Sequence, residues 1–176
     1  MLFAWIQNQI VLRLLIQMDL SKLKWIKNVK PDHGWAYNKP SEMPIPEARI
    51  FSLHWRSQDD KTNAQQPLKS ELVALVQLAR VTHIVELLDD VVYTNSEKEW
   101  GIYRVVKAVW MPPEKFDWGN LPHQREIFGI EDLPPDGAVH DLSRADRMYQ
   151  FNQYWRDLEG LQGFRQHLDK ILTHIS

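Results

Sequence analysis

The sequence contains no cysteine among its 176 residues. This absence excludes disulfide bonds, thiolate metal sites and cysteine nucleophiles, and it leaves no sign of an oxidising compartment. We therefore expect a protein of the reducing cytoplasm. Glycine is also scarce: the seven glycines form neither a GxGxxG nor a GxxxxGK[ST] pattern. The sequence thus offers no backbone cradle for the phosphates of a nucleotide cofactor, and no cofactor is predicted.

A hydrophobic run long enough to span a membrane is missing as well. The most apolar stretch, residues 1–17, is interrupted by polar residues 7–9 and by Arg13, whereas a spanning helix needs about 20 continuous apolar residues. It also lacks the basic start and the small-residue cleavage site of a secretory signal peptide. We interpret it as an amphipathic helix that packs on the domain or on a second copy, or as an early start codon with Met18 as the true start.

Charge of one sign is not in large excess, since the formal net charge is −2. This excludes a protein that coats duplex DNA or an anionic membrane through bulk charge, but it permits a local basic groove. Apolar residues make up 44% of the chain and charged residues 25%, as in ordinary soluble proteins. Residues 18–176 have the length of one domain, and we predict no second globular unit.

Hydrophobic patterning predicts four strands in the middle of the chain. The first alternates, with Phe51, Leu53 and Trp55 on one side, which is the period of a half-buried strand. The other three are rich in β-branched and aromatic residues, and their connections favour antiparallel neighbours over helical crossovers. The four predicted strands span residues 48–56, 72–77, 81–88 and 101–111. We expect them to form a meander or a small barrel.

The C-terminal end is predicted to be helical. Ser143 and Asp146 resemble a capping box, and apolar residues at helical spacing follow as far as residue 159. A second apolar stripe covers residues 164–175. Three segments rich in proline or polar residues are expected to be irregular, with one short helical turn in the last: residues 27–47, 57–69 and 112–141. The predicted fold is α+β, a small antiparallel or mixed β-barrel with a flanking N-terminal helix and two C-terminal helices.

Tryptophan is the unusually abundant residue, with eight copies. Most should be in the core, because aromatic side chains bury the largest areas. Aromatic rings beside basic residues can also hold a nucleobase by stacking. Flat side chains with hydrogen-bond donors gather near the first predicted strand, and three later basic residues could meet phosphates. The first group is Trp35, Tyr37, His54, Trp55 and Arg56, and the second is Arg80, Arg104 and Lys107. For Trp55, pocket and core remain alternative interpretations, because it alternates with Phe51 and Leu53.

The four predicted strands follow one another in a recognisable order. A strand with a tryptophan (FSLHWRS) is followed by a lysine-led strand entry (PLKSELVALVQ), a strand ending in acidic residues (THIVELLDD) and an apolar strand (GIYRVVKAVW). Residues 49–111 thereby resemble the PUA-like superfamily, especially its EVE-type and related modified-base reader domains. In that family a K-x-G-D turn precedes a strand. Here Lys69 opens the sequence Lys-Ser-Glu-Leu, which lacks the glycine.

The resemblance implies a compact β-barrel whose aromatic pocket accepts a flipped or modified nucleobase of DNA or RNA. It implies that a few residues carry the site: Trp35, His54, Trp55 and Arg56 near the pocket mouth, and Thr82 and His83 on the facing strand. The predicted function is therefore a non-catalytic nucleic-acid binding module.

Two other functions remain open. The apolar N-terminal stretch and the aromatic C-terminal helix could pair two chains, as in a scaffold protein or a homodimer. Glu47 with Asp59, Asp60 and Lys61 superficially fits a metal-dependent nuclease, which needs clustered carboxylates and a lysine. The seven histidines form no HExxH or HxH pair, and no GxSxG pattern occurs. Outside the nuclease hypothesis, the sequence predicts neither a metal site nor a catalytic residue.

Overall fold

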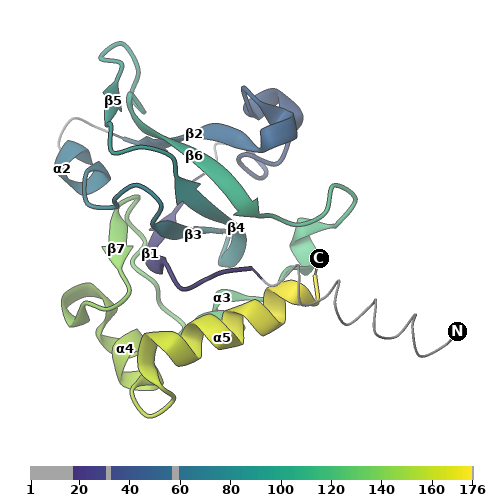
Figure 1. The fold of residues 1–176 in the computed structure, drawn as a ribbon, viewed down its shortest axis with the longest axis vertical. Helices are drawn as coiled ribbons and strands as arrows, with labels where there is room; N and C mark the ends of the chain where they lie inside the picture. The colour runs from purple at the N-terminus through teal and green to yellow at the C-terminus, as the bar shows by residue number, and fades with distance from the viewer. Residues whose placement is uncertain (1–17, 31–32, 57–59, 176) are drawn as a thin grey trace, which may run out of the picture.

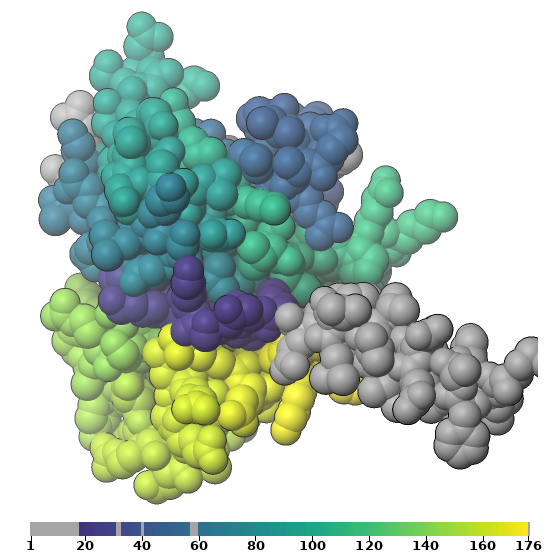
Figure 2. All heavy atoms as spheres, in the orientation of Figure 1, coloured from purple at the N-terminus to yellow at the C-terminus, as the bar shows by residue number. Residues whose placement is uncertain are grey.

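The computed structural model describes residues 18–30, 33–56 and 60–175. The helix expected over residues 1–17 lies outside this part of the chain. The fold is α+β: strands form one mixed, curled sheet that makes half a barrel, and C-terminal helices pack along it (Figure 1). In Figure 2 the yellow and green C-terminal part of the chain forms a layer beneath the purple residues of the first strand.

The elements have the following bounds. The strands are β1 (Leu23–Asn28), β2 (Ile50–Trp55), β3 (Leu72–Gln77), β4 (Arg80–Leu87), β5 (Tyr93–Thr94), β6 (Ile102–Trp110) and β7 (Val139–Asp141). The α-helices are α2 (Lys61–Ala64), α3 (Gln124–Phe128), α4 (Ala145–Trp155) and α5 (Gly160–Thr173). Short 3₁₀ helices are η1 (Pro40–Glu42), η2 (Pro46–Ala48) and η4 (Trp118–Asn120).

The sheet has the strand order β2-β6-β4-β3-β1-β7, and β5 pairs with β6. Three of the predicted strands, β3, β4 and β6, are antiparallel neighbours, which confirms the expectation drawn from their connections. The remaining predicted strand, β2, pairs with β6. All four predicted strands agree with the observed limits to within two residues. β1 runs parallel to β3 and antiparallel to β7, which makes the sheet mixed.

A side chain joins the two ends of this sheet. Asn63 in α2 accepts hydrogen bonds at its Oδ1 from Trp55 Nε1 of β2, at 2.9 Å, and from the backbone N–H of Val139 in β7, at 2.7 Å. Its Nδ2 donates to the Val139 carbonyl at 2.9 Å. Among the described residues, β2 and β7 do not pair through their backbones. Asn63 therefore bridges the gap that a further strand pair would close in a full barrel.

Two apolar cores lie on the two faces of the sheet. One, the barrel core, lies within the curl and includes Phe51, Leu53 and Trp55, the residues that period-two alternation predicts on one face of β2. The other lies between the sheet and the C-terminal helices and includes Phe151 and Phe164, whose ring centroids are 4.9 Å apart. Because both faces are covered, β3 is buried along its whole length.

The helix expected after Ser143 forms, but its predicted start is wrong. The N-cap residue of α4 is Arg144, and its side chain makes no capping hydrogen bond. The Ser143 hydroxyl instead donates to Asp141 Oδ1 at 2.6 Å, at the end of β7. The Ser143 side chain thus binds the end of β7 and does not cap the helix. The predicted end is also wrong, because α4 ends at Trp155 instead of residue 159. The second expected helix is α5.

Two further expectations need correction or completion. Residues 57–69 were expected to be an irregular surface loop, but they contain α2, whose Ala64 is fully buried. β1 and β7 are strands that were not expected from the sequence, whereas the short helical turn expected within residues 112–141 is present as α3. No helix in the described part of the chain is long and apolar enough to cross a membrane.

Arg104 of β6 is a buried cation that ties the end of α2, the turn after it and the loop after β4 to the sheet. Its side chain is completely buried, and its guanidinium donates to the carbonyls of Ala64 at 2.7 Å, Pro67 at 2.9 Å and Asp89. Hydrogen bonds from a charged donor contribute about 1.5–3 kcal/mol each, and a buried carbonyl left without a donor is destabilising. The guanidinium is therefore a structural group of the fold.

We predict that Arg104→Met lowers the free energy of unfolding by about 3 kcal/mol, because three carbonyls lose their donor. Urea denaturation followed by circular dichroism measures the change. Lys107→Met on the same strand is the matched control, since Lys107 is exposed and its loss should cost less than about 0.5 kcal/mol. Equal stabilities of the two variants would contradict this role of Arg104.

Candidate ligand-binding site

A pocket of about 320 Å³ opens beside the end of β1. Its walls come from β1, the segment that follows it, β2 and Trp100, which lies two residues ahead of β6. It is lined by Lys27, Asn28, Val29, Lys30, His33, Ala36, Tyr37, Glu42, His54 and Trp100, and we call it the Lys27 pocket. The volume lies at the lower end of the range of about 300–1,000 Å³ found for small-ligand sites.

Lys27 is the buried charge of this pocket. It is 2% exposed, its Nζ donates a hydrogen bond to the Gly137 carbonyl, and Nζ lies 4.4 Å from the centroid of the Trp55 ring. Burial lowers the pKa of Lys27 to about 7, and the negative charges of Asp60 and Asp136 oppose this shift only in part. At neutral pH the amine is thus present in both protonation states.

Three rings line the pocket around this amine. Tyr37 is half-buried and stacks on Phe51 of the barrel core, with ring centroids 4.3 Å apart and an interplanar angle of 26°. His54 Nδ1 lies 2.7 Å from the carbonyl oxygen of Trp100. Burial lowers the pKa of His54, so its ring is neutral at pH 7. Since Nδ1 must donate to a carbonyl, Nε2 is left as an acceptor.

A buried polar chain holds the pocket wall from behind. Gln77 Oε1 accepts from the Ala36 N–H at 2.8 Å, and Gln77 Nε2 donates to the Ala36 carbonyl at 3.1 Å and to Thr82 Oγ1 at 2.8 Å. Thr82 Oγ1 lies 3.1 Å from His83 Nδ1, and His83 Nε2 lies 3.2 Å from the Tyr37 carbonyl. Burial lowers the pKa of His83 to about 4, so the neutral ring accepts from Thr82 and donates to Tyr37.

The structure thus assigns a different position to most of the residues predicted to bind ligand. Of the predicted aromatic group, Tyr37 and His54 line the Lys27 pocket. Thr82 and His83 are fully buried behind its wall. Trp35 packs on Trp118, with centroids 5.8 Å apart, beside the core under the helices.

For Trp55, the core interpretation is the correct one. The residue is 1% exposed, and its ring is enclosed by the barrel core and covered by Lys27. Arg56 is exposed next to the pocket, where its Nε pairs with Glu99 at 2.9 Å. Its Cζ lies 5.9 Å from the centroid of the Trp100 ring.

The three residues predicted to contact phosphates do not gather at the pocket. Arg104 is completely buried and bonded to backbone carbonyls, so the prediction of a phosphate contact is wrong for this residue. Arg80 donates to the Leu121 carbonyl. Lys107 is exposed in the middle of β6, opposite Glu86 of β4.

The residues of the nuclease hypothesis lie in two elements: Glu47 is in η2, whereas Asp60 and Lys61 stand at the start of α2. Asp60 is the N-cap residue of α2 and Lys61 its first residue, while Asp59 lies outside the described part of the chain. Within residues 18–30, 33–56 and 60–175, no group of three or more histidine, aspartate or glutamate side chains could hold a metal ion.

Sequence reasoning missed Lys27 and Trp100. A signal for Lys27 was available, because Trp25 and Lys27 are two residues apart and therefore share one face of a strand. Both are buried in the observed β1. Trp100 lies in a polar hairpin, and no local pattern distinguishes it from a surface residue.

No family model matches the chain, and neither a curated protein nor a solved structure matches it. The resemblance to PUA-like domains therefore stays a prediction from the sequence.

We predict that Lys27 makes stability depend on pH. Its folded-state pKa of about 7 lies below the ordinary lysine value of 10.5, so the unfolded chain binds more protons between these values. The free energy of unfolding should then rise with pH in this window, by about 2 kcal/mol from pH 7 to pH 9 relative to Lys27→Met. Urea denaturation at a series of pH values measures the difference. Lys24→Met retains Lys27 and should keep the wild-type rise, whereas parallel curves for wild type and Lys27→Met would refute the prediction.

A second prediction concerns the buried chain behind the wall. Gln77→Leu removes both partners of Ala36, so the Ala36 amide should exchange its hydrogen at least tenfold faster than in the wild type, as local opening becomes easier. Hydrogen–deuterium exchange read by NMR gives the rate. Gln153→Leu, at an exposed position of α4, is the control and should leave this rate unchanged. An unaltered exchange rate of the Ala36 amide in Gln77→Leu would show that the Gln77 side chain does not hold the pocket wall.

Proposed function

We propose that this chain is a nucleic-acid binding module, and that the Lys27 pocket receives a nucleobase. The observation that carries the proposal is the combination of flat rings with a buried amine in one pocket. Tyr37, His54 and Trp100 supply aromatic surfaces, and base-on-ring stacking contributes about 1–3 kcal/mol per base. The module binds without chemistry of its own.

Polar groups at the pocket can read the edge of a base. Lys27 Nζ is a donor, and the neutral His54 ring keeps Nε2 as an acceptor. Asn28 uses its Nδ2 to bind the Pro134 carbonyl, which leaves its Oδ1 as a second acceptor. Donors and acceptors in one pocket suit the mixed hydrogen-bonding edge of a nucleobase better than a purely apolar ligand.

The charge around the pocket favours a ligand with phosphates. Among the described residues, Lys27, Lys30 and His33 line it together with the acidic residue Glu42. Glu42 Oε2 accepts hydrogen bonds from the backbone N–H groups of Asn38 at 2.9 Å and Lys39 at 3.2 Å. The carboxylate thus serves the loop, and the basic residues remain available to attract a polyanion despite the net charge of −2.

The half-barrel and its strand order are also compatible with a PUA-like module, and specifically with an EVE-type reader of a modified or flipped base. We propose that the base enters the Lys27 pocket beside the end of β1. The buried hydrogen bonds that run from Gln77 to His83 hold the pocket wall against which the base would lie. DNA and RNA are both candidate ligands, so the choice of nucleic acid becomes an outcome of the binding experiment.

We predict that Trp100→Ala weakens nucleic-acid binding about tenfold or more, because a stacking surface is lost. Fluorescence anisotropy with labelled 12-nucleotide single strands of DNA and RNA, plain or carrying 5-methylcytosine, measures the affinity at low salt. Tyr149→Ala removes an aromatic ring that is 59% exposed on α4, and it is the matched control with unchanged affinity. Absence of binding to every probe, or equal affinities of the two variants, would overturn the proposed function.

A further inference from the structure

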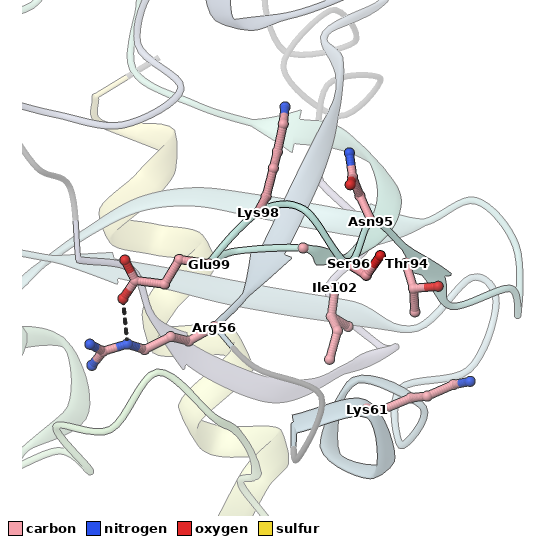
Figure 3. A pocket seen from close by; sticks show the side chains of 9 residues that line it. Arg56, Lys61, Thr94, Asn95, Ser96, Lys98, Glu99 and Ile102 are labelled. Atoms are coloured by element: carbon pink, nitrogen blue, oxygen red, sulfur yellow. Dashed lines mark hydrogen bonds and ion pairs between the residues drawn. The ribbon is translucent and has the colours of Figure 1, made fainter.

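A second hollow of about 320 Å³ adjoins the Lys27 pocket along the chain. It is built by the hairpin that connects β5 to β6, by the residue after β2 and by the start of α2. Glu99 lines this hollow, and its neighbour Trp100 lines the Lys27 pocket, so the two sites share one stretch of backbone. Figure 3 shows the hairpin crossing above Arg56 and Lys61, with the Arg56–Glu99 ion pair at one side.

The rim of this hollow is fixed by hydrogen bonds of the hairpin. The Asn95 N–H donates to the Gly101 carbonyl at 2.6 Å, and the Lys98 N–H donates to the Asn95 carbonyl at 3.3 Å. A side chain at Gly101 would collide with the Asn95 carbonyl, so the turn closes this tightly only with glycine there. The backbone that carries Lys98 and Glu99 is therefore held in place, while their side chains reach into solvent.

The hollow is cationic and lined by hydroxyls. Among the described residues, Arg56, Lys61 and Lys98 line it together with the carboxylate of Glu99, and Thr94 and Ser96 add hydroxyl groups. In Figure 3 the two lysines extend to different sides, so they can reach successive groups of an extended ligand. The Arg56–Glu99 pair is weak, because both side chains are about two-thirds exposed, at 67% and 65%. An incoming phosphate can replace Glu99 at Arg56 and accept two hydrogen bonds.

Arg56 connects the hollow to the pocket. Its Cζ lies 5.9 Å from the centroid of the Trp100 ring, and Trp100 lines the Lys27 pocket. A base stacked in that pocket thus lies next to a guanidinium at the near end of the hollow. We propose that the hollow binds the phosphates beside the pocketed base, so that the ligand is a single strand of two or more nucleotides rather than a free base or mononucleotide. This inference rests on the proposed function of the Lys27 pocket.

The salt dependence of binding tests the inference. For a single strand, the logarithm of the binding constant falls with the logarithm of salt concentration by about 0.7 per phosphate contacted, so the three cations of the hollow should contribute about −2 to the slope. The double variant Lys61→Gln/Lys98→Gln should bind a 12-nucleotide single strand at least tenfold more weakly at low salt, with a slope less steep than that of the wild type by about 1.4. Glu99→Gln should bind severalfold more tightly, because it frees Arg56. Lys170→Gln removes one positive charge on α5, and this control should behave as the wild type.

The outcomes separate the two proposals. If the 12-nucleotide strand binds and Trp100→Ala weakens it, but the double lysine variant keeps the wild-type affinity and slope, the phosphate hollow is refuted and the base pocket stands. A 5′-mononucleotide that binds as tightly as the 12-nucleotide strand also refutes the hollow. If no strand binds, the proposed function fails and the inference fails with it. Circular dichroism of each variant verifies that the fold is retained.

Discussion

The fold depends on one side-chain amide, that of Asn63, which joins the two ends of an open sheet. Its three hydrogen bonds link Trp55 in β2 to Val139 in β7, where no backbone ladder runs among the described residues. Each such bond contributes about 1 kcal/mol net, but buried partners left unpaired cost more. The bridge keeps the segment before β7 close to β1, so that Gly137 can accept from Lys27. The barrel core, the buried Lys27 amine and the Lys27 pocket therefore all depend on the hydrogen bonds of Asn63.

The two buried cations of the half-barrel, Arg104 and Lys27, differ in how many acceptors compensate their charge. Arg104 has three carbonyl acceptors and holds loops together. Lys27 has one carbonyl and the face of Trp55, which compensate its charge less completely, and burial lowers its pKa to about 7. Such incompletely compensated charges are characteristic of functional sites. It is Lys27, not Arg104, that lines a pocket, and the proposed recognition of a base follows from that difference.

Elements whose pattern is local could be predicted from the sequence, whereas those that depend on distant partners could not. β2 alternates within six residues, and the prediction of its buried face is confirmed. β1 and β7 are short or lysine-bearing and become strands by pairing with each other and with β3. Lysine side chains are seldom buried, so the two-residue spacing of Lys27 from Trp25 indicated burial only once β1 was known to be a strand. Trp55 was ambiguous because a ring on an alternating strand suits a core and a pocket equally well.

The central claim is that a nucleobase enters the Lys27 pocket, and NMR chemical-shift mapping tests it directly. A uniformly ¹⁵N-labelled protein titrated with a short single-stranded oligonucleotide should show its largest amide shifts at Val29, Ala36 and Trp100, which line the pocket. The amide of Tyr149 on α4 should not move. If the oligonucleotide binds while these three amides keep their free positions, the base is held elsewhere and the account is wrong.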